Sequence, residues 1–185
     1  MTDNKIGEVL EAENKLPDAL AAYRDSLAIA GPLAKADPGN TVSQRDLAVS
    51  NGNIGDILAA QGNLPDALKS YRDSLAIIDR LTKADPGNAG WQRDLSVADN
   101  KIGNILLAQG NLTEALKSYG DGLAIIDRLA KADPGNAQWQ RDLSVSYNRI
   151  GDILADQGNL PDALKSYSDC LAIRDRLATA DPGNA

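Results

Sequence analysis

A block of 48 residues recurs along the chain, and this period constrains the fold more than any other feature of the sequence. Asp-Pro-Gly-Asn begins at Asp37, Asp85, Asp133 and Asp181, and a tyrosine follows the same period at Tyr23, Tyr71, Tyr119 and Tyr167. Residues 93–137 and 141–185 are identical at 33 of 45 positions. Because the copies are so similar, we expect one structural unit to be repeated, without a separate functional role for any one copy.

Two helices are predicted within each unit, as the fourth unit illustrates. Leu143, Tyr147, Ile150 and Leu154 are spaced four, three and four residues apart, which places them on one face of a helix. Gly158 predicts the end of this helix, because glycine readily takes the left-handed conformation that follows a helix. A second apolar stripe follows at once, so the two helices are expected to be antiparallel neighbours.

The predicted second helix has recognisable ends. Asn159 with Asp162 three residues on is typical of a helix N-terminus, and Pro161 falls in the first turn, where a missing N–H costs nothing. Asp181-Pro182 predicts the end of the helix, since the residue before proline avoids the α region. Pro-Gly at the centre of this reversal favours a type II turn. The sequence therefore predicts an all-α fold of helix hairpins.

The pattern resembles the tetratricopeptide repeat, on the strength of Tyr147, Ile150-Gly151, Ala163 and Tyr167. That repeat is about 34 residues long, so each unit here is about 14 residues longer, as in the longer bacterial variants of the family. The excess lengthens both helices by about two turns, or roughly 10 Å, at the end where Asp-Pro-Gly-Asn lies. The resemblance implies a right-handed α-solenoid over residues 1–185 as a single domain, with a truncated repeat at 1–44 and full repeats at 45–92, 93–140 and 141–185.

Glycines and aromatic residues inside the predicted helices are interpreted as packing residues. A glycine within a helix costs about 1 kcal/mol relative to alanine, so its recurrence indicates close helix contact. These glycines are Gly7, Gly55, Gly103 and Gly151. We expect the four repeated tyrosines to be core residues, and Trp91 and Trp139 to seal the lengthened hairpins, with partner binding by an exposed tryptophan as the alternative.

Composition argues against catalysis and against nucleic acid. There are 19 basic and 26 acidic residues, a net charge of -7, which is the wrong sign for gripping nucleic acid or anionic lipid. Histidine is absent, and Cys170 takes the place of Ser26, Ser74 and Gly122, as a small residue at a helix crossing would. We expect no catalytic residue, no cofactor and no metal site, and a cytoplasmic protein without a membrane segment.

A Gln-Arg-Asp triplet recurs with Arg45, Arg93 and Arg141 at its centre. We expect these arginines to pair with acidic residues late in the preceding second helix, Asp79 and Asp127, and so to align successive repeats. Exposed pairs of this kind contribute about 0–1 kcal/mol each.

The resemblance also implies a concave surface lined by first helices, which would bind a peptide or another protein segment. Carried over to this sequence, its polar residues are Asn4, Glu8, Glu11, Asn53, Asp56, Asn100, Lys101, Asn104, Asn148, Asp152 and Asp156. Asparagine can both donate to and accept from a peptide backbone, while carboxylates favour a basic or neutral ligand. Only Asn53 and Lys101 fit the family pattern that grips a C-terminal carboxylate, so such a clamp is not expected. Charge reversal at Asp56 and Asp152 should weaken a basic peptide without unfolding the protein; a solvated acidic wall without a ligand is the alternative.

Two further hypotheses are an assembly role and a regulatory role. The sequence shows no polar capping helix after the fourth unit, so near-identical repeats could stack end to end into a homo-oligomer or scaffold. Alternatively, the chain is a regulatory segment of a larger bacterial signalling protein, by analogy with the family.

Overall fold

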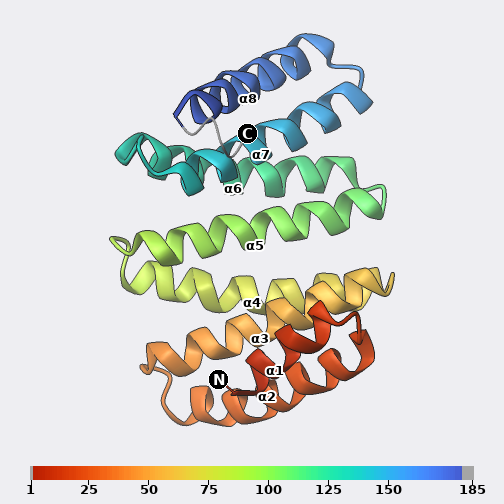
Figure 1. The fold of residues 1–185 in the computed structure, drawn as a ribbon, viewed down its shortest axis with the longest axis vertical. Helices are drawn as coiled ribbons and strands as arrows, with labels where there is room; N and C mark the ends of the chain where they lie inside the picture. Colours follow the sequence, from red (N-terminus) through yellow and green to blue (C-terminus); the bar gives the residue numbers. More distant parts are fainter. Residues whose placement is uncertain (1, 181–185) are drawn as a thin grey trace. The chain divides into compact units, whose positions relative to one another are not determined.

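The computed structural model describes residues 2–180, with the side chains of Thr2 and Asp3 excepted, and the described residues form eight helices and no strand. The helices are α1 (Thr2–Ala12), α2 (Leu16–Ala36), α3 (Thr41–Ala60), α4 (Leu64–Ala84), α5 (Ala89–Ala108), α6 (Leu112–Ala132), α7 (Ala137–Asp156) and α8 (Leu160–Ala180). The predicted all-α fold of antiparallel helix hairpins is confirmed, as the pairs α3–α4 and α7–α8 illustrate (Figure 1). The predicted helix end at Asp181-Pro182 lies outside the described residues.

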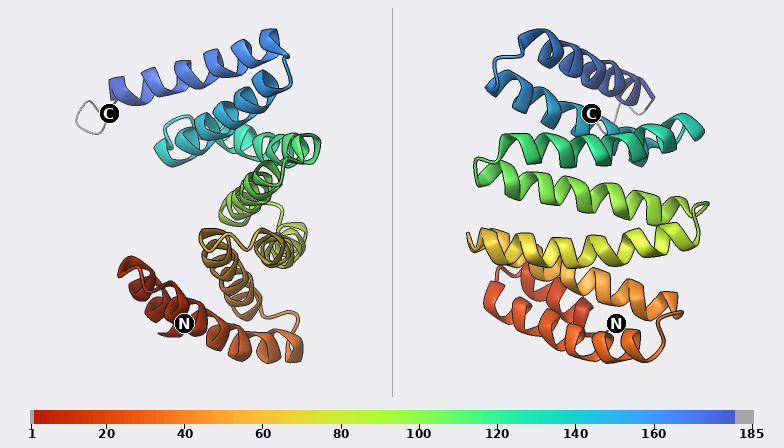
Figure 2. Two further views of the ribbon diagram at one scale, coloured as in Figure 1. Left: turned by 90° about the vertical axis from the view of Figure 1, so that its right-hand side faces the viewer. Right: turned by 180° about the vertical axis from the view of Figure 1, so that it is seen from behind.

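Contacts divide the chain into two compact units, Met1–Trp91 and Gln92–Ala185. In the first unit α2 packs on both α1 and α3, and α3 on α4; in the second, α7 packs on both α6 and α8 (Figure 2). The boundary lies within α5, one residue before the repeat boundary predicted after residue 92. The single solenoid over residues 1–185 stays a prediction.

The turn between the two helices of each hairpin is built on a left-handed residue. Gly62, Gly110 and Gly158 have φ of 76, 79 and 77°, as predicted for Gly158. In the first hairpin Asn14 takes this conformation, with φ of 59°. In the other three hairpins an asparagine follows the glycine and precedes the second helix, and Asn159 Nδ2, for example, donates to Asp162 Oδ2 at 2.7 Å.

The three Asp-Pro-Gly-Asn segments that the structure describes, at 37–40, 85–88 and 133–136, are not type II turns. The type II turn predicted at 181–184 lies outside the described residues. The structure gives Gly39, Gly87 and Gly135 no positive φ, which a type II turn would require at this position. Instead, the aspartate side chain accepts from the glycine N–H, at 3.1 Å for Asp37 Oδ1 and Gly39 N. The closing asparagine then caps the next helix, since Asn136 Oδ1 accepts from Trp139 N at 3.1 Å. After this cap, α7 begins at Ala137, six residues before Leu143, the first residue of the apolar stripe that predicts it.

Candidate functional site

A tyrosine from the second helix packs directly on a glycine of the first. A Cβ atom at Gly55 would lie 2.6 Å from Tyr71 Cε1, and one at Gly151 would lie 2.7 Å from Tyr167 Cε1. The other two hairpins have the same contact, at Gly7 and Gly103. These positions therefore accept no side chain, which confirms the predicted role of the glycines. Three of the tyrosines are buried, and Tyr167 on α8 is partly exposed.

Each tyrosine hydroxyl donates to a polar side chain on the first helix. The Oη atoms lie 3.0 Å from Glu11 Oε2 for Tyr23, 2.6 Å from Asp56 Oδ1 for Tyr71, 2.5 Å from Asn104 Oδ1 for Tyr119 and 3.0 Å from Asp152 Oδ1 for Tyr167. All four acceptors are among the residues predicted to face a peptide, so they have a role within the hairpin that sequence reasoning missed. The available signal was a polar residue placed 15 positions before the tyrosine in three of the four 48-residue repeats.

These surroundings keep the phenols protonated. Burial raises the pKa of Tyr71, and the hydrogen bond to Asp56 and its negative charge raise that pKa further. Burial and Glu11 raise the pKa of Tyr23 in the same way. At neutral pH each hydroxyl is therefore a donor, as its acceptor requires.

In the first unit, the predicted surface residues differ in exposure. Glu8 and Glu11 on α1 are exposed, whereas Asn53 and Asp56 on α3 are half-buried. Asn4 is buried, and its Oδ1 accepts from Ser50 Oγ at 3.3 Å. Asn4 thus holds α1 against α3 and is not part of an open surface.

In the second unit, Asn104 and Asp156 are exposed, while Lys101 on α5 is half-buried. Asn148 Nδ2 donates to Asp152 Oδ2 at 3.1 Å, so both oxygens of Asp152 accept hydrogen bonds within the protein.

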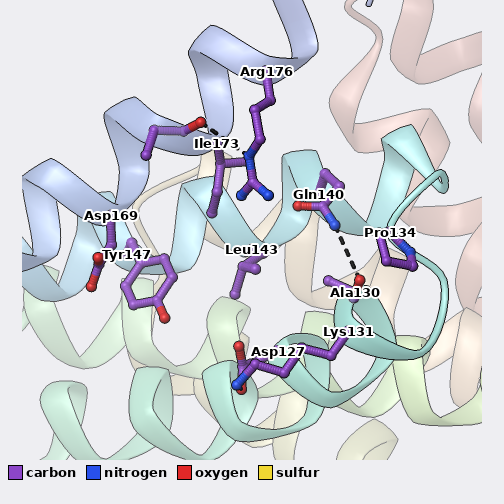
Figure 3. Close-up of a pocket in the computed structure, with 11 residues that line it drawn as sticks. Asp127, Ala130, Lys131, Pro134, Gln140, Leu143, Tyr147, Asp169, Ile173 and Arg176 are labelled. Atoms are coloured by element: carbon purple, nitrogen blue, oxygen red, sulfur yellow. Dashed lines mark hydrogen bonds and ion pairs between the residues drawn. The ribbon is translucent and has the colours of Figure 1, made fainter.

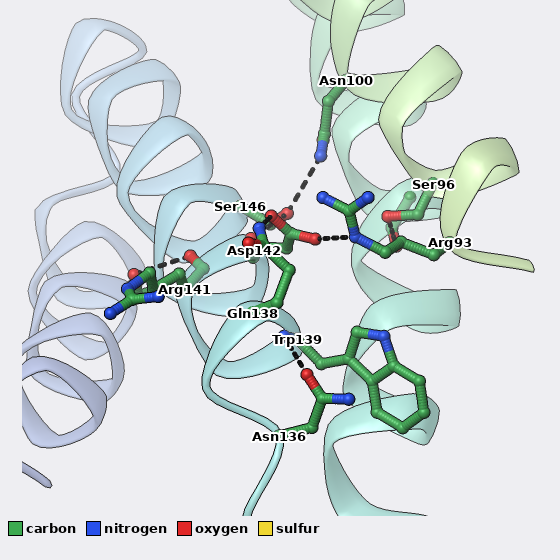
Figure 4. A network of polar contacts seen from close by, with 11 residues as sticks. Arg93, Ser96, Asn100, Asn136, Gln138, Trp139, Arg141, Asp142 and Ser146 are labelled. Carbon is green, nitrogen blue, oxygen red and sulfur yellow. Dashed lines mark hydrogen bonds and ion pairs between the residues drawn. The ribbon is translucent and has the colours of Figure 1, made fainter. Parts of the chain in front are cut away.

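Asn100 repeats the role of Asn4 in the second unit. Its Nδ2 donates to Ser146 Oγ at 3.3 Å, which joins α5 to α7 (Figure 4). Asn4 and Asn100 lie two repeats apart in the sequence, so the same polar link joins successive first helices in both units.

The expected partner of Arg93 is wrong. Arg93 Nε donates to Asp142 Oδ2 at 2.6 Å, in a partly buried ion pair between α5 and α7 (Figure 4). Asp79 and Asp127 instead bind Lys83 and Lys131 on their own helices, at 2.7 and 2.6 Å. Each of these aspartates forms its ion pair with a lysine one turn away on the same helix. The ion pair between repeats therefore joins two first helices, α5 and α7.

Trp91 of α5 packs against the buried cluster of Ala48, Ile77 and Leu81, so the contact joins it to the preceding hairpin α3–α4. That Trp91 seals its own hairpin stays a prediction.

A pocket of about 340 Å³ lies between the ends of α6, α7 and α8 in the second unit (Figure 3). Its apolar wall includes Leu143, Tyr147 and Ile173. Its lining includes the ion pair of Asp127 and Lys131 on α6, at 2.6 Å, and both Asp169 and Arg176 of α8. Sequence reasoning did not predict this pocket; the signal is Tyr147, which replaces the Asn51 and Asp99 of the two preceding repeats.

Cys170 is buried, in keeping with a small residue at a helix crossing. Within the described residues, no three His, Cys, Asp or Glu side chains cluster closely enough to hold a metal ion. Over the same residues, no helix combines the length and apolar character needed to cross a membrane.

Comparison with known proteins finds one matching family model and a similar solved structure. The sequence model of the tetratricopeptide repeat matches residues 47–85 and 143–178. The structure is similar to the crystal structure of BtubC (BKLC) from P. vanneervenii, with a TM-score of 0.74 and 15% sequence identity, over 99% of this chain and 64% of that one. No curated protein matches the sequence.

Proposed function

We propose that this chain, which carries tetratricopeptide repeats at residues 47–85 and 143–178, is a non-enzymatic module that binds a peptide segment of a partner protein. Repeats of this family generally mediate protein–protein interaction, and the family is typically non-catalytic. The observation that carries the proposal is the acidic and amide-rich character of the first helices in both units.

The surface proposed for binding is narrower than the sequence predicts. Asn4, Asn100 and Asp152 are engaged within the protein. Glu11, Asp56 and Asn104 are engaged too, because each accepts a tyrosine hydroxyl. The proposed binding residues that remain are Glu8 and Asn53 in the first unit and Asp156 in the second. The carboxylates favour lysine or arginine on the ligand, while Asn53 can pair with its backbone. We therefore propose a basic or neutral extended peptide.

The structure changes the choice of variants for the test. Asp56 and Asp152 accept the hydroxyl protons of Tyr71 and Tyr167, so reversing their charge would disturb the hairpins as well as any ligand. Glu8 and Asp156 are exposed, and the variant Glu8→Lys/Asp156→Lys leaves the tyrosine hydroxyl bonds intact. A control with the same change in net charge is Asp25→Lys/Asp175→Lys, on exposed positions of second helices.

The experiment screens the full chain against a peptide array of graded net charge and then titrates the best binder. We expect affinity to rise with positive charge on the peptide. The first variant should weaken the best binder by roughly tenfold, which corresponds to about 0.7 kcal/mol for each reversed charge. Equal weakening by the control variant, or no dependence on peptide charge, would remove the first helices as the binding surface.

A further inference from the structure

Helix α8 presents an apolar stripe that no described residue of its unit covers. Leu160, Leu164, Tyr167 and Leu171 follow the spacing of one helix face, and all four are exposed. Leu164 is 68% exposed, whereas Leu20, at the equivalent position of α2, is 9% exposed. The sequence is the same at both positions, so the difference lies in what packs on the helix.

The opposite kind of face is exposed on α1. Ile6 and Val9 lie on its outer side, and with Lys5 and Leu10 they line an open apolar depression of about 340 Å³. Val9 is 59% exposed, whereas Ile57, one repeat later on α3, is fully buried.

The structure contains internal examples of how these two faces combine. In the first unit, α2 packs against α3, so the helix bearing Leu20 covers the helix bearing Ile57. In the second unit, α6 packs against α7 in the same way, and Ile150 and Ile153 of α7 are buried. A second helix followed by a first helix is therefore an interface that this sequence already makes twice.

We infer that α8 of one copy docks on α1 of a second copy, in a head-to-tail contact that repeats the α2–α3 and α6–α7 interfaces. Leu160, Leu164 and Leu171 would cover Ile6 and Val9 of the second copy. A second copy is the occupant that the observations favour, because the two exposed faces are the two halves of one interface that recurs inside the chain. Such a contact is heterologous, so each bound copy leaves one face of each kind available for further copies.

The test uses two variants of the full chain, each of which introduces a charge into one of the two apolar faces. Leu164→Glu places a charge in the α8 stripe, and Val9→Glu places one in the α1 depression. Both side chains are exposed, so the variants should fold, and far-ultraviolet circular dichroism checks that they do. The matched control is Val42→Glu on α3, where the valine is 56% exposed and the equivalent residues of the next two repeats are Gly90 and Gln138.

Molar mass is measured by light scattering after size-exclusion chromatography at concentrations differing about a hundredfold. We expect the unmodified chain and Val42→Glu to exceed 19.5 kDa increasingly with concentration, and each end-face variant to remain monomeric. An equimolar mixture of the two end-face variants keeps one intact α8 face and one intact α1 face. This mixture should therefore form dimers and nothing larger.

Four results would overturn the inference. The first is an unmodified chain that stays monomeric at the highest concentration. The second is self-association of Val9→Glu alone, which would mean that two α8 faces pair with each other. The third is self-association of Leu164→Glu alone, which would mean that two α1 faces pair with each other. The fourth is an equal effect of Val42→Glu, which would show that any new surface charge prevents association.

Discussion

Gly55 and Gly120 both lie inside helices, yet a methyl group should have opposite effects at the two positions. At Gly55 the added carbon would meet the ring of Tyr71 at 2.6 Å, whereas at Gly120 no atom lies within 4 Å. Gly120→Ala should therefore stabilise by up to about 1 kcal/mol, the ordinary gain in helix propensity. Gly55→Ala should destabilise by about 1–3 kcal/mol, because overpacking exceeds that gain. Urea denaturation of both variants measures the difference, and a shift of the same sign in both would contradict the packing argument.

The raised tyrosine pKa values predict a loss of stability at alkaline pH. A phenol with an unperturbed pKa of about 10 keeps its proton longer in the folded protein than in the unfolded chain. Its contribution is therefore fully present below pH 10 and is lost as the pH rises above 10. The free energy of unfolding, followed by denaturation between pH 8 and pH 11, should fall at the upper end.

Tyr71→Phe provides the control for this pH dependence. Phenylalanine keeps the ring against Gly55 but has no proton to lose, so the alkaline fall should be shallower. The lysine–aspartate pairs on the helix surfaces act in the same direction and remain in this variant, as Lys69 with Asp73 shows. An unchanged slope in Tyr71→Phe would show that the tyrosine does not cause the fall.

At the scale of elements, local signals predicted the structure well and distant ones did not. The apolar spacing in the fourth unit predicted α7, and Gly158 predicted where it ends, because both depend on neighbours within a turn or two. The pairing of Asp56 with Tyr71 depends on how two helices meet across a hairpin, which spacing alone does not reveal. In the three described Asp-Pro-Gly-Asn segments the aspartate accepts from the glycine N–H and the glycine has no positive φ, whereas the segment for which a type II turn was predicted lies outside the described residues.

The ion pair between α5 and α7 should contribute more than an exposed pair on one helix. Arg93 and Asp142 are partly buried and join two elements, whereas Lys117 and Asp121 are exposed neighbours on α6. A double-mutant cycle with alanine at both positions should give a coupling of about 1 kcal/mol for the first pair. The same cycle on Lys117 and Asp121 should give about 0.3–0.5 kcal/mol. Equal coupling energies would show that the ion pair between α5 and α7 stabilises the protein no more than an exposed pair on one helix.

At the scale of the whole molecule, stability should be lowest in α1 and α8. In repeat proteins each unit is stabilised mainly by its neighbours, and these two helices have uncovered apolar faces. Amide hydrogen exchange at low protein concentration should therefore show weaker protection in α1 and α8 than in α3 and α7. Exchange that is uniform across these four helices would mean that each helix opens only with the whole chain.

The tyrosine hydroxyl bond also explains how a hairpin can grow longer without losing its alignment. Apolar stripes alone would tolerate a slide of one helix along the other by a full turn, about 5.4 Å, because similar side chains would meet again. A hydroxyl that must reach one acceptor, beside a glycine that admits only that ring, permits a single axial setting. The hydrogen bond between Tyr71 and Asp56 lies near the tight turn at Gly62, whereas Asp-Pro-Gly-Asn lies at the far end of the same helices. Length and alignment are therefore set at opposite ends of the hairpin, so turns can be added at one end without disturbing the other.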